Sequence, residues 1–212
     1  MRMRKKPNLI PRMERCGDIL VREPEKLCGH WLKAYPHKGL SLELGCGKGR
    51  FTCETAAAIP EKLFVAIERV PDAMVIAMER AVAAKLTNVR FMDRDVARLL
   101  DIIAPGEAER IYINFCDPWP HKKHAKRRLT SGGFLTLYKQ VLAEDGEIHF
   151  KTDNDPLFEY SLEQFEANGF ELSEVTRNLH EHGPQGVMTD YEKKFYDEGI
   201  TINRCVAKVK KP

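Results

Sequence analysis

The feature that most constrains the fold is a unit that repeats along the chain: a short apolar stretch, an acidic residue at its end, and a segment with helical periodicity. Seven apolar stretches have the length and composition of strands, at residues 40–44, 63–67, 89–92, 110–115, 146–151, 170–176 and 200–209. Helices are predicted between them, over residues 50–58, 72–84, 96–103, 133–142 and 157–167. Because strands that alternate with helices pair in parallel, the sequence predicts an α/β, doubly wound, mostly parallel sheet.

The first 38 residues lack this periodicity. They contain four prolines, and six of the first fifteen residues are Lys or Arg. We expect residues 1–38 to form a basic arm that ends in a short helix near residues 25–35, and residues 39–212 to form a single domain.

Composition argues against several classes of protein. No apolar run approaches the roughly 20 residues of a membrane helix. Four of the first six residues are basic, and the N-terminus lacks the apolar stretch that a secretory signal requires. The six cysteines have no paired CxxC spacing, which indicates reduced thiols and a cytoplasmic protein. The net charge is only +3, but the basic residues are clustered, so any electrostatic field is local.

Acidic residues stand at the ends of five predicted strands: Glu43, Glu68, Asp95, Asp117 and Asp153. A single acid in such a place is more often a helix cap or a solvated turn residue. Ligands of doubly wound sheets bind at the carboxyl ends of the strands. Since the acid recurs at five ends, the sequence predicts a ligand site along this edge of the sheet.

The loop Gly45-Cys46-Gly47-Lys48-Gly49 discriminates between cofactors. A dinucleotide site has GxGxxG, but here the sixth position is Arg50. Glu43, next to the loop, would repel a pyrophosphate and attract the ammonium and sulfonium groups of S-adenosylmethionine. Glu68, about 20 residues beyond the glycines, is expected to accept hydrogen bonds from the ribose hydroxyls. Asp95 is expected near the adenine amino group.

A second motif, Asn114-Phe115-Cys116-Asp117-Pro118-Trp119-Pro120, follows the fourth predicted strand. Its prolines predict a stiff, extended loop. Five of the next eight residues, 121–128, are Lys or Arg. Alone, this basic strip would indicate a solvated helix face. Behind an acid and an aromatic residue at a strand end, it favours phosphate binding.

These motifs resemble those of the bacterial TrmB-type tRNA (guanine-N7-)-methyltransferases. Further matching pieces are residues 1–7, Lys126-Arg127-Arg128-Leu129-Thr130, His149-Phe150-Lys151-Thr152-Asp153-Asn154 and Thr189-Asp190-Tyr191-Glu192. The pieces span nearly the whole chain in family order. The resemblance implies a seven-stranded, Rossmann-like fold, S-adenosylmethionine as cofactor, and methylation of N7 of guanine 46 in the variable loop of tRNA.

The resemblance also implies roles for individual residues. The expected cofactor contacts are Glu43, Gly45, Gly47, Gly49, Glu68, Asp95 and Asp117, and Asp117 is also the expected catalytic residue. The expected substrate contacts are His121, Asp153, Thr189, Asp190, Tyr191 and Glu192. The expected RNA-binding residues are Lys122, Lys123, Lys126, Arg127 and Arg128. The family usually has a lysine where His121 stands, so either His121 takes over this contact or Lys122 supplies the displaced amine.

The chemistry needs positioning rather than proton transfer, because N7 of guanine carries a lone pair and no proton. A carboxylate can accept both N1–H and N2–H of guanine, and adenine offers no such pair. Asp117 or Asp153 is expected to hold that edge of the base. Trp119 is expected either to stack on the base or to order its own loop.

Alternatives remain at this stage. Thr189 and Glu192 have the spacing of a capping box, so Glu192→Gln is expected to leave the melting temperature unchanged whether or not Glu192 contacts the substrate. An adenine-N6 or small-molecule methyltransferase and a non-catalytic RNA-binding module are the rival functions. No metal is expected, because methyl transfer needs none and His121, His124 and Cys116 lack a fourth ligand. The expected partner is tRNA, and the enzyme is expected to be a monomer or a homodimer.

Overall fold

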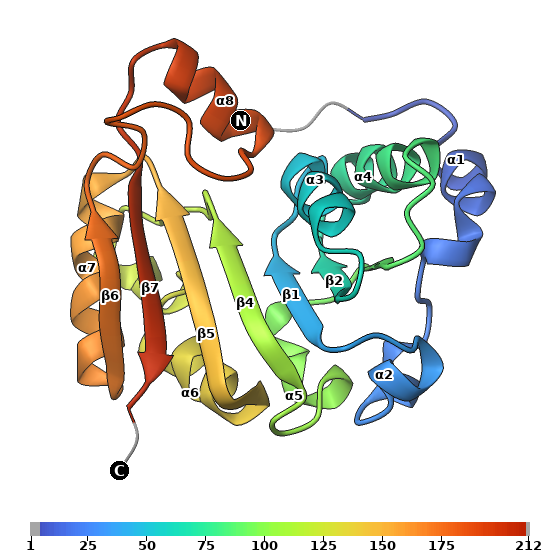
Figure 1. Ribbon diagram of the computed structural model, residues 1–212, viewed down its shortest axis with the longest axis horizontal. Coiled ribbons are helices and arrows are strands. Elements are labelled where there is room, and N and C mark those ends of the chain that lie inside the picture. The colour runs from blue at the N-terminus through green and yellow to red at the C-terminus, as the bar shows by residue number, and fades with distance from the viewer. Residues whose placement is uncertain (1–4, 211–212) are drawn as a thin grey trace.

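The computed structural model describes residues 5–210 and contains one seven-stranded sheet with the order β3-β2-β1-β4-β5-β7-β6 (Figure 1). The strands are β1 (Leu40–Leu44), β2 (Leu63–Ile67), β3 (Val89–Met92), β4 (Ala108–Asn114), β5 (Leu142–Thr152), β6 (Phe170–Thr176) and β7 (Asn203–Val209). Strands β1 to β5 are parallel, and β7 runs antiparallel between β5 and β6. The predicted fold class is confirmed. The basic residues Arg2, Arg4 and Lys211 lie outside the described residues.

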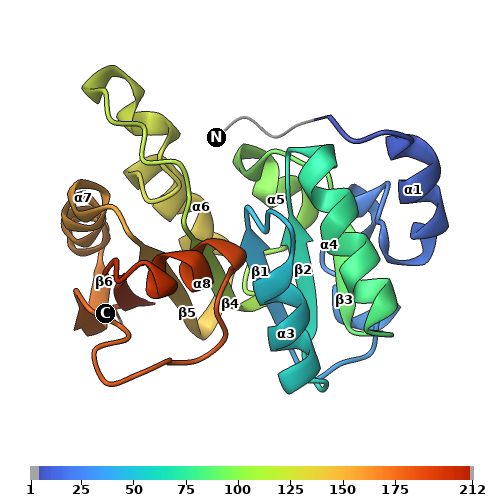
Figure 2. The ribbon, with the colours of Figure 1, turned by 90° about the horizontal axis from the view of Figure 1, so that it is seen from above.

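Helices cover both faces of the sheet. They are α1 (Leu9–Arg15), α2 (Trp31–Ala34), α3 (Arg50–Ala58), α4 (Pro71–Ala83), α5 (Leu99–Ile102), α6 (Gly132–Val141), α7 (Asp155–Ala167) and α8 (Asp190–Asp197). Short 3-10 helices lie at η1 (Gly17–Ile19), η2 (Pro24–Leu27), η3 (Val96–Arg98) and η4 (Lys122–Arg127). Helices α3 and α4 lie on one face and α5, α6 and α7 on the other, while α8 lies across the upper end of the sheet (Figures 1 and 2).

The strands form where they do because their side chains are buried on both faces. All five residues of β2 are buried, and their side chains alternate between two core clusters. Leu63, Val65 and Ile67 belong to the cluster under α5 and α6, whereas Phe64 and Ala66 belong to the cluster under α3 and α4. A continuous apolar run is what such a two-sided strand requires.

Several predicted boundaries are wrong. The strand predicted over residues 200–209 begins only at Asn203, as β7. The helix predicted over residues 25–35 is broken into η2 and α2, because Gly29 has a left-handed φ of 75°. The helix predicted over residues 96–103 is likewise split into η3 and α5. Strand β5 begins at Leu142, directly after α6 and before the predicted start at Gly146, because its first residues pair irregularly with β4.

The segment before β1 packs against the sheet. Leu20 bridges to Phe91 of β3, and Arg12 of α1 forms an ion pair with Glu79 of α4 at 2.6 Å. Trp31 is fully buried, and its indole N–H donates to the carbonyl of Ile102 at 2.7 Å. This segment therefore holds the outer edge of the sheet and contributes an aromatic residue to the core.

Candidate active site

The five strand-end acids lie along one edge of the sheet. Glu43 is the second-last residue of β1, and Glu68 directly follows β2. Asp95, Asp117 and Asp153 follow β3, β4 and β5 within a few residues. Since these strands are parallel, their carboxyl ends meet at the edge that is uppermost in Figure 1. The structure thus brings the predicted acids together at one end of the molecule.

The glycine loop leaves open space next to these acids. Gly45, Gly47 and Gly49 all have left-handed φ angles, of 83°, 55° and 71°, which favour glycine. A Cβ added at Gly45 or Gly47 would meet no atom within 4 Å, whereas one at Gly49 would lie 2.4 Å from the Cβ of Ala77. The first two glycines therefore keep room for a ligand, and the third lets α3 pack closely on α4.

Glu68 and Asp95 are held by backbone amides. The Glu68 carboxylate accepts hydrogen bonds from the N–H of Gly47 at 2.8 Å and from the N–H of Val70 at 2.9 Å. Asp95 caps η3 by accepting from the N–H of Ala97 at 3.0 Å. Each carboxylate has further lone pairs. Both residues can therefore order their loops and still accept hydrogen bonds from a ligand.

Glu43 is a buried carboxyl group at the centre of this edge, with only 2% of its surface exposed. It accepts hydrogen bonds from the Thr52 hydroxyl and from Nδ2 of Asn114, the latter at 3.1 Å. Burial raises the pKa of Glu43 to about 7, against the opposing effect of these two bonds and of Lys151. A cationic group bound beside Glu43 would favour its ionised form, because opposite charges stabilise each other in a dry site.

Asp117 is presented to solvent on a strained loop. It is exposed, and it lies between Phe115 with φ 53° and Trp119 with φ 42°. Left-handed backbone at residues other than glycine costs on the order of 1–3 kcal/mol each and is often found at functional sites. The neighbouring Cys116 is a passive thiol, since burial raises its pKa to about 12. The loop therefore holds a single outward-facing carboxylate at the end of β4.

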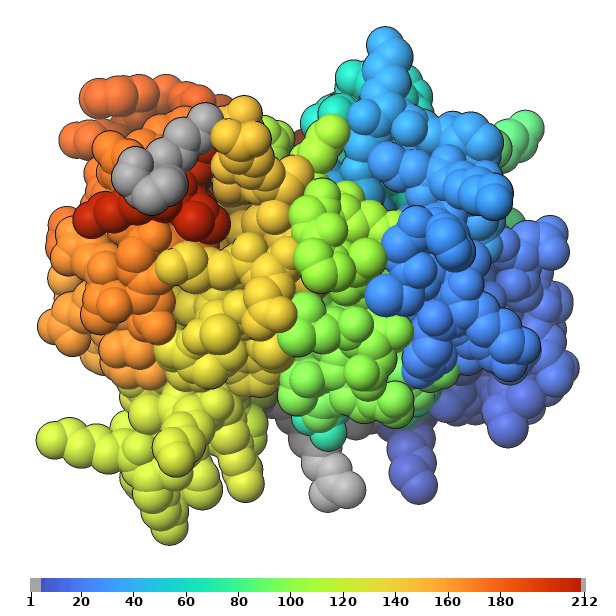
Figure 3. All heavy atoms as spheres, turned by 90° about the horizontal axis from the view of Figure 1, so that it is seen from below, coloured from blue at the N-terminus to red at the C-terminus, as the bar shows by residue number. Residues whose placement is uncertain are grey.

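The basic strip forms η4 and protrudes from the body of the protein. It is the yellow-green segment at the lower left of Figure 3. Lys122, Lys123 and Lys126 are exposed, and no acidic side chain of residues 5–210 forms an ion pair with them. Arg127 instead lies over the Trp119 ring at 4.9 Å, and Arg128 turns inward toward the same loop.

Thr189 is the N-cap of helix α8, and the capping box that was predicted between Thr189 and Glu192 is confirmed. Glu192 is fully buried, and its carboxylate accepts from Nζ of Lys151 at 2.6 Å and lies 3.1 Å from Nε2 of His180. Tyr191 is 54% exposed and stacks on Phe195. Of the predicted substrate contacts, Tyr191 is therefore exposed to solvent, whereas Glu192 is buried and joins α8 to β5 through its ion pair with Lys151.

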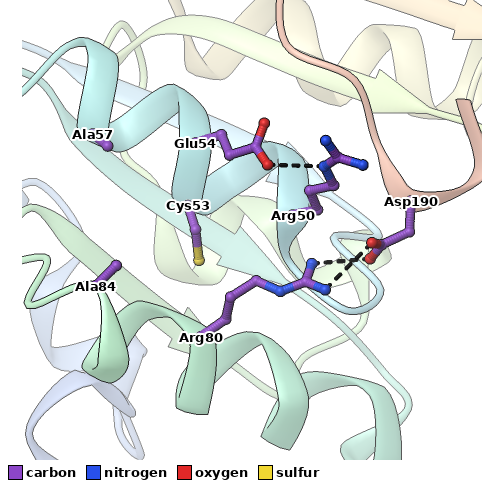
Figure 4. A pocket seen from close by; sticks show the side chains of 7 residues that line it. All are labelled: Arg50, Cys53, Glu54, Ala57, Arg80, Ala84 and Asp190. Atoms are coloured by element: carbon purple, nitrogen blue, oxygen red, sulfur yellow. Dashed lines mark hydrogen bonds and ion pairs between the residues drawn. The ribbon is translucent and has the colours of Figure 1, made fainter. Parts of the chain in front are cut away.

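Asp190 borders a cavity of about 430 Å³ (Figure 4). Its carboxylate pairs with Arg80 of α4 at 2.9 Å and 3.3 Å. Arg50, which also lines the cavity, pairs with Glu54 at 2.8 Å. Both arginine charges are thus neutralised from within the cavity. Apart from Asp190, none of the predicted site residues lines it.

The sequence reasoning missed several residues that shape the site. Lys151 lies 7% exposed at the end of β5, although lysine is rarely buried without a partner. A lysine within an apolar strand is a signal that a buried acid lies nearby. Asn114 also escaped prediction, and its buried Oδ1 has no hydrogen-bond partner in the described chain. Within residues 5–210, no three His, Cys, Asp or Glu side chains are grouped to hold a metal, and no helix is long and apolar enough to cross a membrane.

Solved structures place this fold among the Rossmann-like methyltransferases. The 16S rRNA methyltransferase KamB matches with a TM-score of 0.62 and 16% identity, over 82% of this chain and 89% of that chain. TrmN from Thermus thermophilus matches with a TM-score of 0.58 and 19% identity, over 93% of this chain and 53% of that chain. At these identities the likeness concerns the fold alone.

Sequence comparison narrows the class to a family. The profile of the family described as "Putative methyltransferase" matches residues 37–205. The tRNA (guanine-N(7)-)-methyltransferase of Halalkalibacterium halodurans is 45% identical over 98% of this chain and 95% of that protein. The same enzyme is 42% identical in Geobacillus kaustophilus, over 98% and 96%, and 41% identical in Listeria monocytogenes serotype 4b, over 98% of both. The chain belongs to this family of tRNA (guanine-N(7)-)-methyltransferases.

The residues present fit the cofactor of this family, S-adenosylmethionine. The open glycine loop has space beside it, and the buried Glu43 lacks a full counter-charge. The family assignment confirms the predicted enzyme class and cofactor. The individual roles of the site residues stay predictions.

Proposed function

We propose that this enzyme methylates N7 of the guanine at position 46 in the variable loop of tRNA. The observation that carries the proposal is the exposed carboxylate of Asp117, held on a strained loop between the cofactor edge and the protruding η4. The close relatives named for guanine-N7 methylation of tRNA support it. We place the reaction in the cytoplasm and leave open whether the enzyme acts as a monomer or a homodimer.

The cofactor edge has one task, to hold and orient the methyl donor. When bound, S-adenosylmethionine supplies a methyl group on a sulfonium. In our proposal Glu43 and the open side of Gly45 and Gly47 hold its methionine part, Glu68 accepts from the ribose, and Asp95 lies near the adenine. The lone pair on N7 needs no general base, so the protein contributes alignment and electrostatic stabilisation.

The guanine is proposed to lie between the ends of β4 and β5. Asn114 and Lys151 are direct neighbours in the parallel ladder, so the acids that follow them, Asp117 and Asp153, project from adjacent strand ends. One of these exposed carboxylates accepts N1–H and N2–H of the guanine. Asp117 also stabilises the positive charge that arises on the alkylated ring.

The tRNA backbone is proposed to lie along η4. Lys122, Lys123 and Lys126 are available as phosphate ligands, and His121 lies next to them at the start of the helix. Thr189 and Tyr191, at the start of α8, are proposed to line the nucleotide from the other side. Trp119 already stacks against Arg127, so a base could stack only on its free face.

The test is to incubate the enzyme with labelled S-adenosylmethionine and an unmodified tRNA transcript and to map the product nucleotide. We expect 7-methylguanosine at position 46, and a loss of at least about tenfold in kcat for Asp117→Asn and for Asp117→Ala. Label in N6-methyladenosine would instead indicate an adenine enzyme. Binding of tRNA without any transfer would indicate an RNA-binding module, and wild-type rates in both variants would remove Asp117 from the mechanism.

A further inference from the structure

Arg128 is the one residue of the predicted RNA-binding set whose guanidinium hydrogen-bonds to the Asp117 loop, within the described chain. Its Nε donates to the carbonyl of Pro118 at 3.0 Å, and its Nη2 donates to the carbonyl of Trp119 at 3.1 Å. The guanidinium also lies over the ring of Tyr160 in α7, 4.2 Å from the ring centre. Two donors and one flat face of this side chain are thus used within the protein.

The loop that carries Asp117 needs hydrogen bonds from another part of the chain to fix its conformation. Pro118 and Pro120 have no backbone N–H, so they cannot donate hydrogen bonds that would fix the loop. Phe115 and Trp119 both have left-handed backbone, a conformation that persists only when surrounding contacts determine it. A planar guanidinium can donate to two successive carbonyls at once, which a lysine ammonium does less well.

The contacts divide the basic strip into two parts. Lys122, Lys123 and Lys126 are exposed, whereas Arg128 is half-buried between the loop and α7. Helix α7 begins two residues after Asp153. Arg128 therefore joins the loop that carries Asp117 to the helix that follows the second candidate acid.

We propose that Arg128 is a positioning residue that fixes the Asp117 loop against Tyr160, and that it is not a phosphate ligand of the tRNA. The inference rests on the proposed role of Asp117. It predicts that Arg128 governs the rate of methyl transfer, while the lysines of η4 govern the affinity for tRNA.

The kinetic test compares Arg128→Lys with Arg177→Lys. Arg177 is a matched control, because it also lies near an aromatic ring of α7 and pairs within the protein, yet it does not touch the loop. For Arg128→Lys we expect kcat to fall by about tenfold or more, with the KM for tRNA and the salt dependence of binding unchanged. Arg177→Lys should match the wild type. Wild-type kcat in Arg128→Lys, or a lower salt slope with an unchanged kcat, would overturn the proposal.

A second measurement follows the loop itself. The chain has two tryptophans, and Trp31 is fully buried, so quenching of fluorescence by acrylamide reports mainly on Trp119. We expect stronger quenching in Arg128→Lys and in Tyr160→Leu, which removes the ring but keeps the arginine. Unchanged quenching in both variants would contradict the proposal even if one of them folded poorly. Acrylamide should quench the fluorescence of Asp117→Asn as it quenches that of the wild type. An active Asp117→Asn enzyme would refute the role of Asp117, and the role of Arg128 would still be tested by the quenching of Arg128→Lys and Tyr160→Leu.

Discussion

At the scale of single residues, the site contrasts two carboxyl groups in opposite environments. Glu43 is buried at the end of β1, and Asp117 is exposed after β4. Burial disfavours the charged form of Glu43, so this group is poised to become fully ionised when a cation binds beside it. Asp117, in water, can meet a neutral base whose charge arises only during the reaction.

The burial of Glu43 predicts a pH dependence of stability. Its pKa is raised from 4.5 to about 7 in the folded protein, so between these values the native state binds more protons than the unfolded state. The free energy of unfolding therefore falls as the pH rises, by at most roughly 1.4 kcal/mol per pH unit, and levels off above the native pKa. Urea unfolding of wild type and Glu43→Gln at pH 5, 6, 7 and 8 should show this slope in their difference. Parallel profiles would contradict it.

At the scale of elements, α8 is a short helix that depends on buried contacts. Glu192 of α8 meets Lys151 of β5, and desolvation lowers the pKa of Lys151 while Glu192 opposes that shift. Asp190, two residues earlier, meets Arg80 of α4 at the protein surface. One helix is thereby tied to the sheet by a buried charge pair and to a neighbouring helix by a partly exposed pair.

These ties change the expected outcome of Glu192→Gln. The sequence alone predicts an unchanged melting temperature, because glutamine also completes a capping box. The structure adds a buried Lys151 that would lose its counter-charge, and breaking such a pair costs about 3–5 kcal/mol. We expect a clear loss of stability in urea unfolding. Asp190→Asn, which breaks the more exposed pair, should cost at most about 1 kcal/mol. Equal stabilities of Glu192→Gln and wild type would show that the pair does not hold α8.

At the scale of the whole molecule, the net charge is small, but the positive charges are clustered in particular places. The net charge is +3, yet three lysines that have no acidic partner among residues 5–210 stand together on the protruding η4. Lys26 belongs to η2 and Lys33 to α2, and α2 lies at the lower end of the sheet in Figure 1, away from the carboxyl ends of the parallel strands. The arrangement predicts that tRNA binding depends on the position of a lysine and not on its charge alone.

The double variant Lys122→Ala/Lys123→Ala tests this arrangement. Each lost phosphate contact should lower the slope of log affinity against log salt by about 0.7–0.9, so we expect a decrease of up to about 2 in the slope. The control Lys26→Ala/Lys33→Ala removes the same charge at the other end of the molecule and should leave the slope unchanged. Equal slopes for both double variants and wild type would assign η4 to a solvated surface.

The sequence by itself determined the strands, the acids at their ends, the open glycine loop and the capping box at Thr189. Each of these depends on residues that are close in the chain, such as the continuous apolar run of β2 or the three-residue spacing from Thr189 to Glu192. Local patterns of this kind keep their meaning in any tertiary context that buries them.

Only the tertiary structure decided which charged side chains form ion pairs or hydrogen bonds within the protein. Lys151 and Glu192 are 41 residues apart, and Arg80 and Asp190 are 110 apart. In the sequence, Arg128 is indistinguishable from the other cations of the basic strip. In the structure it donates hydrogen bonds to two backbone carbonyls of the Asp117 loop. These partners meet because the fold brings distant segments of the chain together. How much each charged pair stabilises the protein depends on how deeply the fold buries it. Burial and tertiary contacts cannot be derived from spacing along the chain. For this physical reason, the sequence alone could not distinguish a residue that stabilises the fold from one that binds the substrate.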